Sequence, residues 1–397
     1  MTRIPIDDSA DRPRVHAFIV GVGHYPYCNT EWIDGHFVSG KIKAVLRGIA
    51  TPLTTASLSA ITFAEWLAND PQPFSIPIGT IEVLISAGTP QKVWKGATSF
   101  PVERASFGAL QRSCLQWYKR CNEHRENVAI FFWCGHGWAG WADEGRFELL
   151  ADDIGEDEVQ PFNNVVDFTT THLKMNSCKA ATQCFFIDAC RTFPDGMDGL
   201  TQGHSRPLIN VTGFEDPEGA GKDRPVWSSV AHGMESVTPP HAPSGFTEAV
   251  VKVLQGLGAD GRSGTWRIET ELLKRKLSDT LKWAGAKYPI SLGGYQVGSS
   301  VLRVLDEPPI IPYRLGCLPK NALPHARWEL HDLNSSKGSC PVSQAGEISA
   351  GSYQIFVNFP EGLPYTFEGN IMELFDTPGF EKEVKLGEKS EAETENT

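Results

Sequence analysis

Long apolar runs alternate along the chain with segments whose apolar residues recur at helical spacing. The runs VHAFIVGV (15–22), TIEVLIS (80–86), VAIFFW (128–133) and QCFFIDA (183–189) are typical of strands covered on both faces. Further strands are predicted at 207–213, 226–231 and 295–305, and helices at 54–69, 102–125, 246–257 and 265–285. This alternation predicts an α/β domain with a mostly parallel sheet flanked by helices.

The pattern changes at a proline-rich linker, residues 306–312 (DEPPIIP). Short segments with alternating polar and apolar residues follow it, among them RWELHDL, SYQIFVNF, GNIMELF and KEVKL. They predict a small all-β sandwich over residues 313–387, while the acidic sequence of residues 388–397 predicts a disordered tail. The first domain is therefore expected to span residues 14–305.

Composition narrows the classes of protein that fit. A chain of 397 residues has room for two or three domains, and its net charge of −12, with no cluster of Lys and Arg, argues against nucleic-acid binding. No apolar run approaches the length of a membrane span, and the N-terminus lacks the apolar core of a signal peptide. Nine cysteines without a CxxC pair favour a reducing cytoplasm, where a thiol stays free for chemistry.

Two of the apolar strands end in chemically reactive residues. One runs into CGHG (134–137) and the other into DAC (188–190). Carboxyl ends of parallel strands meet at one edge of a sheet, so His136 and Cys190 are expected to lie close together. An imidazole can deprotonate or position a thiol, and the thiolate is the nucleophile. The backbone amides of Gly137 and Cys190 are the expected donors to an oxyanion.

The motifs FFWCGHG and FFIDACR resemble those of the caspase-like cysteine peptidases, which include caspases, metacaspases, paracaspases and their bacterial relatives. The His precedes the Cys by 54 positions, close to the family's interval of about 50. HAFIVGVGHYP resembles the family's first strand, and VWSSVAHGMESVTPPHAPSGFTEAVVKVL its later substrate-binding strand, loop and helix. The resemblance covers residues 14–305 and implies a caspase-like peptidase domain that acts on proteins, with Trp227 and Ser228 at the substrate.

The residues around the thiol suggest a specificity. In metacaspases an aspartate two residues before the cysteine helps to hold a basic P1 side chain, and Asp188 has that place here. The resemblance thus implies cleavage after Arg or Lys, with Arg preferred because its guanidinium pairs bidentately with a carboxylate. Ser59 stands near the place of the family's second pocket acid, and Cys134 where metacaspases have a pocket serine. A structural ion pair of Asp188 with Arg191 is the alternative.

The segment between residues 192 and 224 has loop composition outside 207–213, and we expect it to be mobile and regulatory. If P1 is basic, Arg206, Lys222 and Arg224 are its candidate self-cleavage sites, as in a zymogen that proteolysis activates.

No cofactor is expected. GLGADG follows a helix rather than a strand and so is not a dinucleotide fingerprint, and no HExxH sequence or matching Cys/His set predicts zinc. An acidic stretch could bind Ca²⁺, as in some metacaspases, but it lacks EF-hand spacing, which favours a solvated loop. Its members are Asp143, Glu144, Asp152, Asp153, Glu156, Asp157 and Glu158.

The first hypothesis is therefore a cytoplasmic cysteine endopeptidase with a Cys190–His136 dyad, in signalling or antiviral defence by analogy with bacterial relatives. Its expected partners are protein substrates, and an activating protease or a partner protein bound through the C-terminal β domain, but neither nucleic acid nor membrane. The alternative is a catalytically silent caspase-fold scaffold that binds a protein through that domain. A thiol oxidoreductase is disfavoured because no resolving CxxC is present.

Overall fold

The computed structural model describes residues 2–6, 11–35, 40–139, 146–190, 205–211, 222–229, 241–286, 290–295, 298–334, 338–367, 371–375 and 379–388. The chain divides into two compact units. The first unit is Met1–Val251 with Ala286–Leu302, and the second is Lys252–Gly285 with Arg303–Thr397. The second unit thus includes residues 252–285, which the predicted first domain contains.

A seven-stranded sheet forms the centre of the first unit. In spatial order its strands are β1 (Thr2–Pro5), β3 (Ile78–Ser86), β2 (Val15–Val22), β6 (Val128–Cys134), β10 (Thr182–Asp188), β11 (Arg224–Ser228) and β13 (Ser291–Tyr295). The five inner strands are mutually parallel, and only the two edge strands run antiparallel to their neighbours. The mostly parallel sheet of the sequence-based prediction is therefore confirmed.

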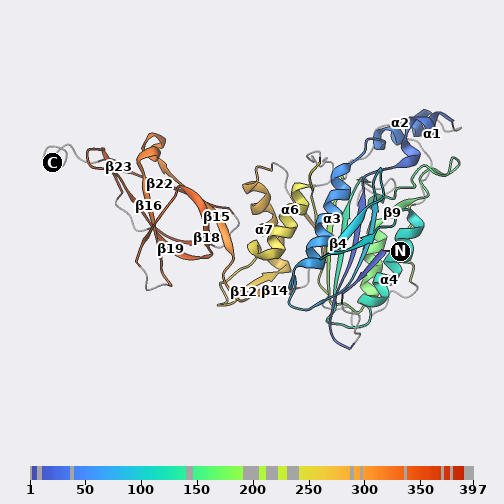
Figure 1. Cartoon of the computed structure of the whole chain (residues 1–397), viewed down its shortest axis with the longest axis horizontal. Coiled ribbons are helices and arrows are strands. Elements are labelled where there is room, and N and C mark those ends of the chain that lie inside the picture. The colour runs from blue at the N-terminus through green and yellow to red at the C-terminus, as the bar shows by residue number, and fades with distance from the viewer. Residues whose placement is uncertain are drawn as a thin grey trace. The chain divides into compact units, whose positions relative to one another are not determined.

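Helices cover both faces of this sheet, and aromatic side chains fill the space beneath them. Figure 1 shows α3 (Thr54–Asn69) and α4 (Phe107–Cys121) on opposite sides of the strands. Phe63 of α3 stacks on Phe132 of β6 with ring centroids 4.6 Å apart. On the other face, the ring centroid of Trp117 of α4 lies 6.1 Å from that of Phe131, the neighbour of Phe132 in β6. Successive strand residues point to opposite faces, so one strand feeds two cores.

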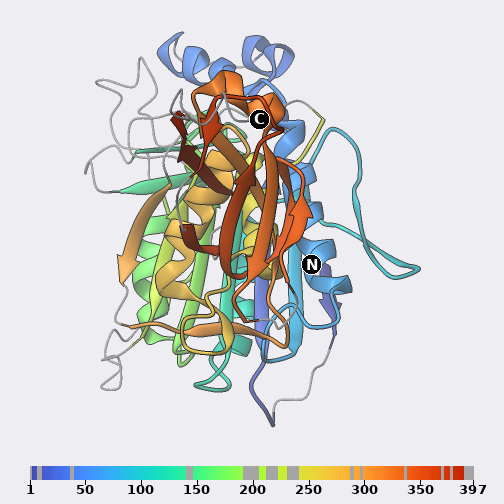
Figure 2. The same ribbon diagram turned by 90° about the vertical axis from the view of Figure 1, so that its left-hand side faces the viewer.

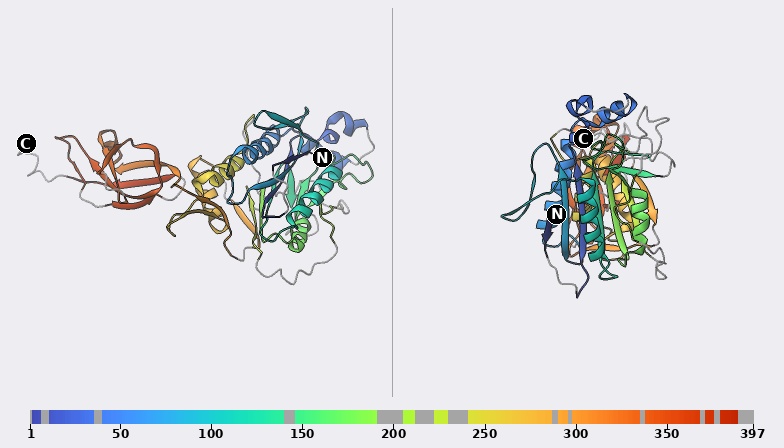
Figure 3. Two further views of the ribbon diagram at one scale, coloured as in Figure 1. Left: turned by 60° about the horizontal axis from the view of Figure 1, so that its bottom comes forward. Right: turned by 90° about the vertical axis from the view of Figure 1, so that its right-hand side faces the viewer.

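The first unit also contains several shorter helices. They are η1 (Pro26–Cys28), α1 (Thr30–Gly35), α2 (Gly40–Ile49), α5 (Phe168–Lys174), η2 (Met175–Ser177) and α6 (Gly245–Lys252). Phe168 of α5 packs on Phe131 at 5.5 Å, on the same face as α4, which lies along the strands in teal in the right-hand view of Figure 3. Both faces of the sheet are therefore covered, as the unbroken apolar strands predict.

Two small antiparallel sheets complete the first unit. β4 (Lys92–Lys95) and β5 (Thr98–Pro101) form a hairpin. β7 (Gly137–Ala139), β8 (Phe147–Leu150) and β9 (Val165–Asp167) form a three-stranded sheet that starts directly after His136.

The second unit contains η3 (Val253–Leu257), α7 (Thr270–Trp283) and the short paired strands β12 (Trp266–Glu269) and β14 (Val301–Leu305). Its remaining sheets have the spatial orders β18-β15-β22, β17-β16-β19-β21 and β20-β23, drawn in orange to red in Figure 2. The bounds are β15 (Ile310–Leu318), η4 (Lys320–His325), β16 (Arg327–Asp332), β17 (Cys340–Val342), β18 (Ala345–Ser349), β19 (Gly351–Asn358), β20 (Tyr365–Thr366), β21 (Ile371–Phe375), β22 (Phe380–Lys385) and β23 (Gly387–Glu388). Buried side chains from β15, β16, β19, β21 and β22 form one core, which includes Trp328, Ile355 and Phe375.

Three predicted elements differ in the structure. The helix predicted over 102–125 begins only at Phe107, because Glu103 bridges to β3 and Asp153 accepts the Phe107 N–H at 2.9 Å. The helix predicted over 265–285 starts as strand β12, which pairs with β14. Of the strand predicted at 207–213, the described residues 207–211 form no strand, and only the preceding Arg206 makes a bridge, to Val166. In each case a partner distant in sequence decides the local structure.

Candidate functional site

The two segments predicted to carry catalysis lie side by side at the carboxyl edge of the sheet. β6 and β10 are neighbours in register, with Cys134 opposite Asp188, so His136 and Cys190 each follow two residues beyond this pair. The Gly135 N–H donates to the Asp188 carbonyl at 3.1 Å. A Cβ atom on Gly137 would lie 3.1 Å from the Cys190 carbonyl oxygen, so the His-Gly turn packs directly on the backbone of the cysteine.

Contacts on two sides fix the backbone of His136. Its N–H donates to the Tyr25 hydroxyl at 3.0 Å, and its carbonyl accepts the Leu150 N–H at 3.1 Å. The Tyr25 ring packs on the imidazole with centroids 5.2 Å apart. Tyr25 belongs to the HYP sequence after β2, and the sequence analysis did not assign it a role at the site. The structure shows it as a positioning residue for His136.

The imidazole of His136 is neutral at physiological pH. Its Nε2 atom is buried and has no hydrogen-bond partner among the described residues. Burial disfavours the charged ring and lowers its pKa to about 4. A neutral imidazole with an unused ring nitrogen can accept a proton from a thiol.

Cys190 differs from most cysteines of the chain in its environment. All nine are free, and seven of them are buried, whereas Cys190 is partly exposed and Cys340 is exposed. Burial raises the pKa of the thiols in the core, as at Cys28, where it reaches about 12, and so keeps them protonated and inert. Cys190 is thus the one cysteine that is accessible to solvent and also has the His136-Gly137 turn packed on its backbone.

A polar chain of contacts lies below the thiol. Asp188 is buried, and the Cys134 thiol lies 3.5 Å from its Oδ2 atom. Cys134 also hydrogen-bonds Ser59 of α3, whose hydroxyl accepts the Ser244 N–H at 2.9 Å. Burial, and then the Asp188 carboxylate, raise the pKa of Cys134 well above its usual value. The protonated thiol can therefore donate to Asp188, and Asp188 is the one carboxylate in this chain of contacts.

The two predicted substrate-binding residues of β11 lie further along the same edge. Trp227 is fully buried and stacks on Phe186 at 5.0 Å, as a core residue does. The hydroxyl oxygens of Ser228 and its neighbour Ser229 are buried without a hydrogen-bond partner among the described residues. With His136 Nε2 and Trp227 Nε1, they are unused polar atoms at or next to the carboxyl ends of the strands.

The candidate self-cleavage sites are poorly placed for cleavage. Arg206 donates its N–H to Val165 and accepts the Asp167 N–H, both at 3.0 Å, and Pro207 follows it. Arg224 is buried in β11 and also precedes a proline, and the buried Lys222 donates from Nζ to the Asn176 carbonyl at 2.8 Å. A peptidase needs an extended, unpaired segment, so this part of the prediction does not fit the structure. Residues 192–204 and 212–221 lie outside the described residues.

The described members of the acidic stretch already have polar partners. Asp152 accepts hydrogen bonds from Ser86 and, at 2.9 Å, from Arg104. Asp153 accepts the Phe107 N–H, and burial raises its pKa to about 6. Within the described ranges no group of three or more His, Cys, Asp and Glu could hold a metal ion. Asp143 and Glu144 lie outside those ranges.

Residues 104–282 match the family model of the caspase domain. "Uncharacterized protein y4kE" of Sinorhizobium fredii (strain NBRC 101917 / NGR234) is 26% identical over 302 residues, which cover 70% of this chain and 81% of that protein. The crystal structure of caspase-1 from Spodoptera frugiperda aligns with a TM-score of 0.40 and 13% identity, over 77% of this chain and 98% of that one.

The matched segment contains both strand-end motifs of the site. The central part of the chain therefore resembles the caspase domain in sequence, and it supplies the strands that lead to His136 and Cys190. A C-terminal region of further β-sheets follows this part. In the part of the chain that the structure describes, no single helix is long and apolar enough to cross a membrane, and one bent pair, Ile42–Ile49 with Thr54–Asn69, passes by length and composition alone.

Proposed function

We propose that the protein is a cysteine endopeptidase in which Cys190 and His136 form the catalytic dyad. The observation that carries this proposal is the neutral, buried and unpartnered Nε2 atom of His136, on a turn that packs against the Cys190 backbone. In the reaction the thiol proton passes to His136 and the sulfur bonds to the peptide carbonyl carbon. The imidazolium then gives the proton to the leaving amine, and water hydrolyses the thioester.

The backbone amides of Gly137 and Cys190 are the proposed oxyanion donors. Glycine is required at position 137 because a Cβ atom there would lie 2.9 Å from the Glu148 carbonyl oxygen and 3.1 Å from the Ala189 Cβ. The amide can therefore approach the cysteine more closely than it could with any other residue. Preorganised backbone donors stabilise the charge that develops on the carbonyl oxygen.

We propose that the pocket around Asp188 takes a basic P1 side chain, with Arg preferred over Lys. The Cys134 thiol donates to this carboxylate and also hydrogen-bonds Ser59, which by the family resemblance stands near the place of the second pocket acid. One carboxylate can still pair both N–H groups of a guanidinium. Ser228, with its unused buried hydroxyl, is the proposed polar wall beside the substrate.

The biological setting is proposed on the family resemblance alone. It is a signalling or defence role in the cytoplasm, with the C-terminal sheets as a docking region for a protein substrate or partner. Any activating cleavage is proposed outside Arg206, Lys222 and Arg224, whose backbone or side chains are held in the folded chain.

A peptidyl acyloxymethyl ketone with Arg at P1 tests the proposal directly. We expect it to alkylate Cys190 alone, as peptide mapping by mass spectrometry would show, and to leave the exposed Cys340 unmodified. Iodoacetamide is the control reagent, because it labels an accessible thiol without needing a substrate site. Labelling of Cys340 but not Cys190 by the ketone would support the silent scaffold instead.

A further inference from the structure

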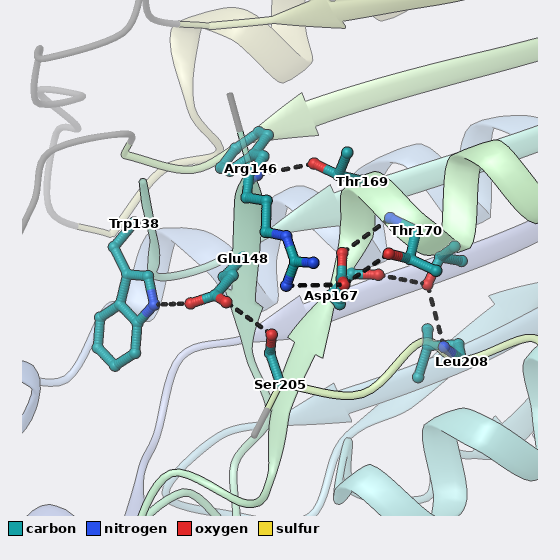
Figure 4. Close-up of polar contacts among 10 residues, drawn as sticks. Trp138, Arg146, Glu148, Asp167, Thr169, Thr170, Ser205 and Leu208 are labelled. Carbon is teal, nitrogen blue, oxygen red and sulfur yellow. Dashed lines mark hydrogen bonds and ion pairs between the residues drawn. The ribbon is translucent and has the colours of Figure 1, made fainter. Parts of the chain in front are cut away.

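Glu148 is a buried carboxylate that the proposed mechanism does not use. It lies in the middle of β8, between the core residues Phe147 and Leu149, and only 7% of it is exposed. Both of its oxygens are engaged, since Oε2 accepts from the Trp138 indole N–H and Oε1 from the Ser205 hydroxyl, each at 2.6 Å (Figure 4).

The surroundings of this carboxylate offer it little charge compensation. Burial raises the pKa of Glu148, while the hydrogen bonds from Ser205 and Trp138 lower it. Asp167 of β9 repels it, and Arg146 lies 3.8 Å from Asp167 rather than in a hydrogen bond to Glu148. An apolar residue of similar size would cost less to bury, so overall stability does not explain the residue.

The two groups that Glu148 holds come from different parts of the chain. Trp138 is directly opposite Glu148 in the β7–β8 pair and follows the His136-Gly137 turn. Ser205 begins the described segment 205–211, which lies beside β9. The segment it opens is fixed further by Arg206, which pairs with β9, and by Leu208, whose N–H donates to Thr171 at 3.0 Å.

The backbone of Glu148 also lies directly beneath Gly137. A Cβ atom on Gly137 would lie 2.9 Å from the Glu148 carbonyl oxygen and 3.1 Å from the Cys190 carbonyl oxygen. The Gly137 residue is thus packed between Glu148 and Cys190, and a shift of β8 would change the distance between the proposed oxyanion donor and the thiol.

We propose that Glu148 is a positioning residue of the active site, which holds Trp138 and Ser205 together and thereby fixes the Gly137 amide relative to Cys190. This role rests on the proposed peptidase function. It acts on the transition state, because the oxyanion forms only there, so its loss is expected in kcat rather than in KM.

The test compares Glu148→Ala with Glu148→Gln in the full chain, using a peptide with Arg at P1. We expect Glu148→Ala to lower kcat by about 10- to 100-fold with KM nearly unchanged, the scale of a displaced oxyanion donor. Glu148→Gln should keep kcat within about 3-fold, because its amide can accept from the indole and donate to the Ser205 hydroxyl. Ser205→Ala removes one of the two hydrogen bonds to Glu148 and replaces Glu148→Ala in the test if that variant does not fold. We expect Ser205→Ala to lower kcat by about 3- to 10-fold.

Hydrogen exchange of residues 136–139 and 205–208 gives a readout that does not depend on activity. Faster exchange in Glu148→Ala, but not in Glu148→Gln, is expected. A wild type that cleaves while Glu148→Ala and Ser205→Ala keep its kcat would overturn the positioning role alone. A wild type that cleaves no peptide would overturn the proposed function itself, and this role with it.

Discussion

The inner strands of the first unit and the strands of the C-terminal sheets bury their side chains in different ways. Every residue of β2 and β6 is buried, whereas buried and accessible positions alternate along β15 and β16. A strand covered on both faces cannot present a side chain to a substrate from its middle. Chemistry in the first unit is therefore confined to the residues just past the strand ends.

The two regions also differ in where unused polar atoms lie. In the first unit, the buried polar atoms without partners among the described residues include those of His136, Ser228 and Ser229 at or next to one edge of the sheet, while others, such as Ser113 Oγ and Gln183 Oε1, lie elsewhere. In the C-terminal sheets the corresponding atom is the indole nitrogen of Trp328, inside the core. These sheets instead expose large apolar side chains, such as Met372 and Leu374 of β21. The first region thus has unused polar atoms at a sheet edge, whereas the second exposes apolar side chains on β21.

The largest effect is expected from the proposed dyad. Cys190→Ala and His136→Ala should each lower kcat by about 10⁴- to 10⁶-fold, with little additivity, because the two groups act as a unit. Cys340→Ala is the matched control, since it removes an exposed thiol in β17 and should leave activity unchanged. A His136→Ala variant with more than about a tenth of the wild-type rate would remove His136 from the mechanism.

Substitution of Asp188 tests whether its buried carboxylate sets the P1 specificity. Asp188→Asn should cost about 2–4 kcal/mol in kcat/KM on substrates with Arg or Lys at P1, and much less on others. A set of fluorogenic peptides that differ at P1 measures this. Wild-type preference for P1 Asp or a small neutral residue would instead show that Asp188 is structural.

The parts of this site that could be predicted are those whose residues lie close together in the sequence. The motifs CGHG and DAC are local, and their place after apolar strands was enough to predict that the segments of His136 and Cys190 lie side by side. The Tyr25 hydroxyl that holds His136 lies 111 positions away, and Ser59 and Ser244 are 185 positions apart. Such contacts depend on how the strands and helices pack, which a local pattern does not encode.

The predicted starts of two helices were wrong for the same reason, because they depend on residues distant in the sequence. The helix α3 was predicted over its full length, 54–69, because its apolar spacing is sufficient by itself. The start of α4 depends on Asp153, 46 positions from the N–H that it accepts, and β12 depends on pairing with β14. Long-range partners overrode the helical pattern at both sites.

Two glycines allow the regions to be compared directly. Gly137→Ala would force a Cβ atom to within 2.9 Å of backbone, whereas a Cβ on Gly316 of β15 would have its nearest neighbours at 3.9 Å. We expect Gly137→Ala to lower kcat about a hundredfold, as the loss of one oxyanion donor does, and Gly316→Ala to leave it unchanged. Equal activity of the two variants would show that the Gly137 amide does not contribute.

The smallest expected effect is an acid-sensitive stability of the first unit. Burial lowers the pKa of His16, His136 and His172 to about 4, and raises that of Glu82 and Asp153 to about 6. As the pH falls below 6.5, the unfolded chain protonates these histidines while the folded chain does not, so the free energy of unfolding decreases. The two acids act in the opposite direction, because below pH 6 the folded chain binds protons that the unfolded chain does not.

From pH 7 to 6 the histidines dominate, and we expect a net loss of about 1 kcal/mol in the free energy of unfolding. Below pH 6 the acids offset about half of the histidine contribution, and we expect a further net loss of about 2 kcal/mol between pH 6 and 5. Urea unfolding at pH 7, 6 and 5, followed by tryptophan fluorescence, measures both. His172→Gln removes one of the three groups and should reduce the loss between pH 7 and 6 by about 0.7 kcal/mol. An unchanged slope in that variant would mean that His172 is protonated in the folded chain, against the burial that lowers its pKa.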